Sequence, residues 1–260
     1  GIKHHLCIMP LATLLENIAG VYLPLFMGNT IQVEPLAELG CQQSSQFDPQ
    51  QFATCIERCQ PDILILLPQM LKSLIQLKKA NSDLFKSLKF AAVGGGKSAQ
   101  SALEEAHQLG LPVYEGYGLS ECAATVSLNT PDMMKLGSVG KVLPHTQVRI
   151  DDSGEIIVSG QAMLGYLHHD DLNQDTENNE IHTGDLGYMD DDGYLYISGR
   201  RKNLLVSSFG RNIAPEWVES ELSHSSLISQ AAIFGDAKPY ISAIITPQEN
   251  VTDKQIQALL

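Results

Sequence analysis

The feature that most constrains the fold is a strand, a glycine turn and a helix in direct succession at residues 88–109. A short apolar segment runs into Gly94, Gly95 and Gly96, and helical periodicity begins a few residues later. A buried strand followed at once by a helix is typical of layered α/β architecture, in which helices cover a central sheet.

The texture of the chain changes twice, which divides it into three parts. Residues 1–136 alternate helical and strand patterns, with predicted strands at 62–67, 88–93 and 111–114 and predicted helices at 52–59, 69–79 and 99–109. Residues 137–201 carry short alternating strands at 147–150, 155–159 and 194–198, separated by Asp/Gly turns. Residues 202–260 predict strands at 203–207, 230–234 and 241–246 and a helix from about Pro215. The expected fold is a layered α/β sheet subdomain, a small β-rich subdomain and an incomplete α+β C-terminal lid.

Composition excludes some classes of function. Lys plus Arg number 17 against 30 Asp plus Glu, a formal net charge of -13, so a nonspecific electrostatic grip on nucleic acid is not expected. The five cysteines are odd in number and scattered, which favours a reducing, cytoplasmic location without disulfides. Cys55 and Cys59 are one helical turn apart, but no second Cys/His pair lies near them in the sequence to complete a zinc site.

An apolar stretch at residues 11–27 could be mistaken for a membrane segment. Glu16, Asn17, Pro24 and two glycines interrupt it, and it falls short of the roughly 20 apolar residues that a spanning helix needs. We predict that this stretch is buried core.

Gly-Lys-Ser at residues 96–98 suggests a phosphate loop. That motif needs a glycine at the position of Ala91, which lies inside the predicted strand, so the phosphate-loop interpretation is poor. Three glycines could still let backbone approach a flat ligand, although a plain tight turn explains them equally well.

The pentapeptide Tyr-Gly-Leu-Ser-Glu at residues 117–121 follows a predicted strand, at the sheet edge where open α/β sheets bind ligands. The Tyr117 ring could stack on a base, the Ser120 hydroxyl could donate to a phosphate, and Glu121 could hold a divalent cation. Ser120 as the N-cap of a following helix is the alternative.

Two later residues have the chemistry to bind a ribose. Asp185 follows Thr-Gly, and a carboxylate there could accept hydroxyl hydrogen bonds. Arg200 ends a predicted strand, where a guanidinium could fork onto oxygens. Taken singly, Asp185 could be a turn residue and Arg200 a surface cation in an Arg-Arg-Lys run.

Together these segments resemble the adenylate-forming superfamily, which includes acyl-CoA synthetases, firefly-type luciferases and the adenylation domains of peptide synthetases. The resemblance covers essentially the whole chain. It implies that Tyr117 stacks on adenine within the Tyr-Gly loop that contains Gly118, that Ser120 contacts phosphate, and that Glu121 holds Mg²⁺.

The resemblance assigns the remaining positions in the same way. Gly94, Gly95 and Gly96 match a turn against adenine, Asp185 and Arg200 match ribose-binding residues, and Lys202 matches the hinge of a rotating C-terminal domain. The segment 207–219 resembles the loop that enters the active site for the second half-reaction, in which Gly210 permits a tight backbone.

The implied reaction joins a carboxylic acid to ATP, giving acyl-AMP and pyrophosphate, and then passes the acyl group to CoA. ATP, Mg²⁺ and CoA are the implied cofactors, and Ser120, Glu121 and Lys202 are the residues implied in catalysis. Charge neutralisation and positioning would supply most of the catalysis.

The branch of the superfamily is read from residues 9–17, which are similar to a Leu-Pro-Leu-Ala-His segment of long-chain acyl-CoA synthetases. Thr13 replaces the histidine of that segment. A fatty acid is therefore the expected acid, and the resemblance allows a peripheral membrane contact of the full-length protein. An acyl-AMP ligase that loads a carrier protein, and a noncatalytic adenylate-binding or interaction module, remain alternatives.

Two segments that the resemblance calls for were not found in the sequence. These are a Ser/Thr/Gly-rich phosphate loop before position 1 and a C-terminal segment that carries the adenylation lysine. We therefore expect the chain to be an internal fragment that does not form acyl-AMP at a useful rate alone.

Overall fold

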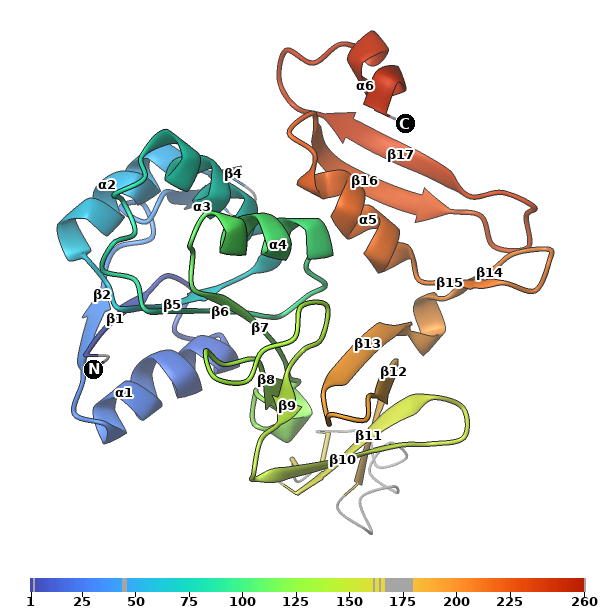
Figure 1. Ribbon diagram of the computed structural model, residues 1–260, viewed down its shortest axis with the longest axis horizontal. Coiled ribbons are helices and arrows are strands. Elements are labelled where there is room, and N and C mark those ends of the chain that lie inside the picture. Colours follow the sequence, from blue (N-terminus) through green and yellow to red (C-terminus); the bar gives the residue numbers. More distant parts are fainter. Residues whose placement is uncertain (2, 44–45, 161, 164, 167–179, 260) are drawn as a thin grey trace.

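A seven-stranded sheet forms the centre of the first part of the chain (Figure 1). The computed structural model describes residues 1, 3–43, 46–160, 162–163, 165–166 and 180–259. The sheet order is β2-β1-β5-β6-β7-β8-β9, parallel through β7 and antiparallel beyond it. Its strands are β1 (His4–Cys7), β2 (Thr30–Val33), β5 (Ile63–Leu66), β6 (Phe90–Val93), β7 (Val113–Tyr117), β8 (Ser127–Leu128) and β9 (Lys141–Val142).

Three amphipathic helices cover one face of this sheet, and the segment η1–α1 lies on the other face (Figure 1). The helices are α2 (Pro49–Cys59), α3 (Pro68–Ala80) and α4 (Gln100–Gln108). Proline stands in the first turn of α2, and the Asp48 side chain caps that helix by accepting from the backbone N–H groups of Gln50 and Gln51. Strand β5 reads Ile-Leu-Ile-Leu without alternation because both of its faces are covered. The α/β class matches the prediction, as do the strands and helices predicted between residues 52 and 114, whereas β1, β2, β8 and β9 were not predicted.

The apolar stretch at residues 11–27 is only partly buried. It forms a π-helix, η1 (Glu16–Tyr22), and one short α-helical turn, α1 (Leu23–Phe26). One side packs on the sheet, but Phe26 is 87% exposed, and Tyr22, Leu25 and Met27 each exceed 60%. The prediction of buried core is therefore wrong for the outward side, because hydropathy does not show which face is covered. Among the described residues, no helix is long and apolar enough to cross a membrane.

A buried polar pair joins η1 to β1. His5 Nε2 lies 2.7 Å from Glu16 Oε1, and the other carboxylate oxygen accepts from the backbone N–H of Met9 at 3.2 Å. Gly20 makes room for the pair, since a Cβ there would meet the Glu16 carboxylate at 2.1 Å. Burial, with Glu16 close by, raises the pKa of the Cys7 thiol to about 12.

A four-stranded antiparallel sheet follows in the order β10-β11-β12-β13. Its strands are β10 (Thr146–Ile150), β11 (Glu155–Gly160), β12 (Glu180–Met189) and β13 (Leu195–Arg200). Leu195 and Ile156 are fully buried in its own apolar cluster. The polar composition of residues 170–180 predicts a loop, and this segment lies outside the described residues up to residue 179.

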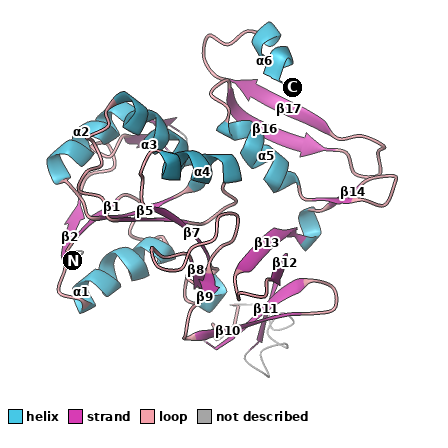
Figure 2. Cartoon of the chain, in the orientation of Figure 1, coloured by secondary structure: helices cyan, strands magenta, loops and turns pink. Residues whose placement is uncertain are grey.

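The last part of the chain, residues 202–259, is a small α+β unit (Figure 2). Of the strand predicted at 203–207, Asn203 belongs to a 3₁₀ turn at Arg201–Asn203 and only Leu205–Val206 form a strand. Next come β14 (Leu205–Val206), β15 (Asn212–Ile213), α5 (Pro215–His224), β16 (Ile228–Phe234), β17 (Ser242–Pro247) and α6 (Asp253–Leu259). Across residues 202–259 only Ile228 and Ile233 are buried.

Polar contacts hold this C-terminal unit against the helices of the large sheet. Lys72 on α3 donates to the backbone carbonyls of Ser223, Ser225 and Ile228 at 2.7–2.9 Å, which caps the C-terminal end of α5. In the opposite direction, Glu221 on α5 accepts from the backbone N–H of Gln100 at the start of α4. Each helix therefore receives a charged cap from the other part of the chain.

Candidate active site

The residues Thr183-Gly184-Asp185 form a turn inside β12. Gly184 has φ +72°, a left-handed conformation that glycine adopts without strain. Thr183 Oγ1 donates to the carbonyl of Ile156 at 2.7 Å and accepts from the backbone N–H of Asp185 at 3.0 Å. The strand register then places Asp185 directly opposite Arg200. The backbone contacts therefore fix the position of the Asp185 Cα, from which the carboxylate extends.

Tyr117 fixes the direction of that carboxylate. Tyr117 ends β7, and its hydroxyl donates to Asp185 Oδ2 at 2.8 Å; Arg200 Nε lies 3.6 Å from Asp185 Oδ1. Burial, reinforced by Asp185, raises the pKa of Tyr117 above its usual value, so the hydroxyl remains a donor at neutral pH. Residues far apart in the sequence therefore meet at one carboxylate.

The loop after Tyr117 is held by backbone packing. A Cβ on Gly118 would lie 1.5 Å from the carbonyl oxygen of Ala124, so only glycine fits. Ser120 opens a 3₁₀ turn, Ser120–Cys122, whose N-cap is Leu119 without a side-chain capping bond. The alternative interpretation of Ser120 as the N-cap of a following helix is therefore wrong.

Glu121 faces the same space from the loop side. Tyr166 donates its hydroxyl to Glu121 Oε1 at 2.8 Å, and this bond raises the pKa of Tyr166. Mg²⁺ is commonly held by one or two carboxylates together with the phosphates of a nucleotide. A single carboxylate at the rim of a cavity fits that donor set.

A cavity of about 610 Å³ joins these groups. It brings together five residues predicted from the sequence: Gly118, Glu121, Asp185, Arg200 and Lys202. Its other lining residues are Leu119, Glu155, Tyr166, Ile181, His182, Thr183, Gly184 and Arg201. Carboxylates and the cations Arg200, Arg201 and Lys202 therefore face one space.

The other predicted positions do not line the cavity. Gly94 lies beside the end of β7, where a Cβ would be 3.5 Å from the carbonyl oxygen of Gly116, and Gly95 has φ +82° in the turn before α4. Gly210 has φ +73° in the exposed turn between β14 and β15. Tyr117 does not line the cavity but donates to Asp185, which does, and Ser120 is exposed in its turn. Their roles toward a ligand remain predictions.

Among the cavity residues that were not predicted as site residues, four are charged or aromatic: Glu155, Tyr166, His182 and Arg201. Glu155 begins a predicted strand yet is only 5% exposed, and a carboxylate on the inward side of a strand is a usable signal. Arg201 was treated as part of a basic run. The remaining two give no local signal, because their partners are distant in the sequence.

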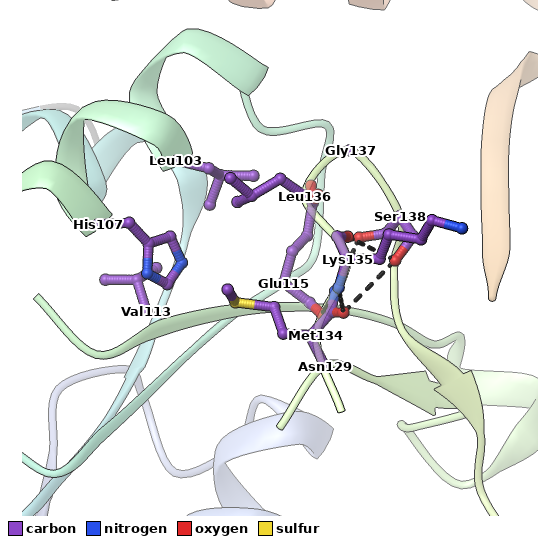
Figure 3. A pocket seen from close by; sticks show the side chains of 10 residues that line it. All are labelled: Leu103, His107, Val113, Glu115, Asn129, Met134, Lys135, Leu136, Gly137 and Ser138. Atoms are coloured by element: carbon purple, nitrogen blue, oxygen red, sulfur yellow. Dashed lines mark hydrogen bonds between the residues drawn. The ribbon is translucent and has the colours of Figure 1, made fainter. Parts of the chain in front are cut away.

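A second cavity lies between α4, β7 and residues 129–138 (Figure 3), and it is far too small for a nucleotide. Its volume is about 10 Å³, roughly the space of one water. Glu115, Asn129 and Lys135 are among its lining residues. Burial raises the pKa of Glu115, and Lys97 and the backbone N–H of Ser98 only partly oppose the shift.

Comparison with protein families identifies the class. The model of the AMP-binding enzyme family matches residues 3–167, and that of the AMP-binding enzyme C-terminal domain matches residues 202–260. The chain belongs to the AMP-binding enzyme family.

Individual relatives differ in the acid that their names specify. A long-chain-fatty-acid–CoA ligase, FadD15, of Mycobacterium bovis is 42% identical over 159 residues, which is 60% of this chain and 26% of that protein. A 2-succinylbenzoate–CoA ligase of Bacillus cytotoxicus is 34% identical over 203 residues, 73% of this chain and 42% of that protein. The chain thus spans less than half the length of these relatives.

Solved structures agree with the fold. O-succinylbenzoate coenzyme A synthetase from Bacillus subtilis, in complex with AMP, matches with a TM-score of 0.78 at 26% identity, over 98% of this chain and 53% of that one. The anthranilate CoA ligase AuaEII matches with a TM-score of 0.84 at 19% identity, over 99% of this chain and 52% of that one.

Proposed function

We propose that this chain forms the adenosine side of the active site of an ATP-dependent acid–thiol ligase. The full-length protein would join a carboxylic acid to the α-phosphate of ATP and then pass the acyl group from AMP to the thiol of CoA. The observation that carries the proposal is the Asp185 carboxylate. Tyr117 donates to this carboxylate, and Thr183 accepts from the backbone N–H of Asp185, at a cavity that Glu121 and Lys202 also line.

The chemistry of the cavity fits an adenylate. The Asp185 carboxylate is an acceptor that suits the paired hydroxyls of a ribose, and the Arg200 guanidinium can donate to ribose or phosphate oxygens. Glu121 would hold Mg²⁺, which supplies charge neutralisation at the phosphates. Lys202 would bring a further cation from the hinge turn.

For the acid, we propose a long-chain fatty acid. The support is the similarity of residues 9–17 to long-chain acyl-CoA synthetases and the 42% identity to a protein named as such a ligase. The relatives named as 2-succinylbenzoate–CoA ligases make that aromatic acid the competitor to test. Thr13, where this segment departs from the long-chain acyl-CoA synthetases, is the residue to vary when activity with the two classes of acid is compared.

Nucleotide binding to the purified chain tests the proposal directly. Isothermal titration should detect AMP and should find much weaker binding of an AMP analogue that lacks both ribose hydroxyls. Asp185→Ala should weaken AMP binding by about tenfold or more, since hydrogen bonds to a charged group contribute about 1.5–3 kcal/mol. Asp191→Ala, at an exposed turn of the same sheet, is the matched control. Equal affinity for AMP and the analogue would contradict the proposal.

Turnover is tested with the full-length protein. Pyrophosphate release with a panel of acids identifies the substrate, and Glu121→Ala should lower that rate severely. Supplying CoA or a carrier protein as the thiol distinguishes a CoA ligase from an acyl-AMP ligase. An unchanged rate in Glu121→Ala would favour the noncatalytic module.

A further inference from the structure

Glu155 is a buried carboxylate that touches two functional segments at once. It starts β11, its side chain is 6% exposed, and it lines the nucleotide cavity. Oε1 accepts from the backbone N–H of Gly184 at 2.8 Å, within the turn that carries Asp185. Oε2 lies 3.1 Å from Arg201 Nη2 and 3.6 Å from His182 Nδ1. A buried charge needs such partners, and here they come from separate segments.

Arg201 is anchored to the β sheet at the point where the chain leaves it. Besides Glu155, its Nη2 donates to Ser153 Oγ in the turn between β10 and β11. Arg201 also opens the 3₁₀ turn that includes Lys202 and leads into the C-terminal unit. The last firm side-chain attachment before that unit therefore passes through the Glu155 carboxylate.

These contacts have a mechanical consequence. A ligand that holds Asp185 restricts the neighbouring peptide of Gly184, and through it the position of the Glu155 carboxylate. The same carboxylate sets the position of Arg201. Ordering one end of such a bridge lowers the entropic cost of ordering the other, which is coupling without a large structural change.

We propose that Glu155 is a positioning residue that couples nucleotide occupancy of the Asp185 turn to the rigidity of the hinge at Arg201–Asn203. The proposal rests on the proposed function in that AMP is the ligand. Glu155 itself touches Gly184 and Arg201, so it acts through them.

Trypsin reads the hinge directly. Residues 150–199 contain neither Lys nor Arg, so cleavage at the hinge gives peptides that begin at residue 150 and end at Arg200, Arg201 or Lys202. Mass spectrometry distinguishes these three peptides by their masses. In the wild-type chain, AMP should slow this cleavage several-fold because the hinge opens less often. The measurement is the rate of cleavage at each bond with and without AMP, beside the AMP dissociation constant from titration.

Three variants separate the two halves of the bridge. Glu155→Gln keeps an oxygen for Gly184 but loses the negative charge that pairs with Arg201. AMP affinity should stay within about threefold, because the hydrogen bond to Gly184 is kept. The protection of the hinge by AMP should be lost, because the charge that pairs with Arg201 is gone and a neutral hydrogen bond contributes only about 1 kcal/mol. Glu155→Ala should lose both the protection and about tenfold in AMP affinity. Ser153→Ala should speed ligand-free cleavage and leave AMP affinity unchanged.

Glu180→Ala is the control, because it removes a half-buried carboxylate that pairs with Arg149 on the same sheet and does not line the cavity. Circular dichroism establishes that each variant is folded, and Glu155→Gln still tests the coupling if Glu155→Ala does not fold. Full protection by AMP in Glu155→Gln would overturn the proposal and transfer the coupling to the Arg200–Asp185 pair. Failure of the wild-type chain to bind AMP would overturn the proposed function instead. Equal ligand-free cleavage of wild type, Ser153→Ala and Glu155→Gln would then still refute the anchoring of Arg201.

Discussion

The large sheet and the C-terminal unit of residues 202–259 are held in place by different forces. The sheet buries a continuous apolar cluster, with Leu6, Phe52, Leu66 and Leu71 almost completely inaccessible. The C-terminal unit buries only Ile228 and Ile233 and reaches the rest of the protein through charged caps on α4 and α5.

This difference separates stability from placement. Apolar burial contributes about 25 cal/mol per Å² and does not depend on one particular atom pair, so the sheet should tolerate the loss of any surface contact. Interfaces inside a chain that are small and polar permit relative motion of their two sides. The position of the C-terminal unit should therefore depend on a few residues.

The largest expected effect is in the core of the sheet. Leu66→Ala should lower the free energy of unfolding by about 3 kcal/mol, because it leaves a cavity among fully buried side chains. Ile244→Ala, at a side chain 66% exposed on β17, should change it by less than about 0.5 kcal/mol. Urea titration measures both, and losses of equal size would break the comparison.

A smaller effect is expected where the C-terminal unit is attached. Lys72→Met keeps the aliphatic stem but removes three hydrogen bonds to the end of α5. Amide hydrogen exchange in residues 215–234 should rise about tenfold, which corresponds to about 1.4 kcal/mol, with no change in β5 and β6. Lys86→Met, which removes an exposed pair with Asp83, is the control. Faster exchange throughout the large sheet would contradict separate placement.

The smallest effect concerns a polar group inside the large sheet. Burial raises the pKa of Glu115 above its ordinary value near 4.5. As pH rises above 4.5 the unfolded chain ionises while the folded chain resists, so stability should fall until the folded pKa is reached. Glu115→Gln should remove this dependence in melts recorded from acid to neutral pH. A parallel loss of stability at every pH would show instead that a carboxylate is needed there.

Local pattern was enough to predict most of the elements, but few of the contacts. Strand β5 follows from an unbroken apolar run and helix α3 from helical periodicity, and Asp185 and Arg200 were found as separate candidates. Their pairing depends on the register of β12 and β13, which a bulge after Leu186 shifts. The bond from Tyr117 to Asp185 joins residues 68 apart in the sequence. Such meetings are set by tertiary packing, which single-residue patterns do not encode.

Gly118 changes how variation in this loop should be interpreted. Its Cα faces the carbonyl of Ala124 so closely that any side chain would collide with backbone. In a mutational scan, position 118 would be intolerant even under selection for folding alone. Intolerance there would report the shape of the loop, whereas intolerance at Asp185 but not Asp191 would report the ligand.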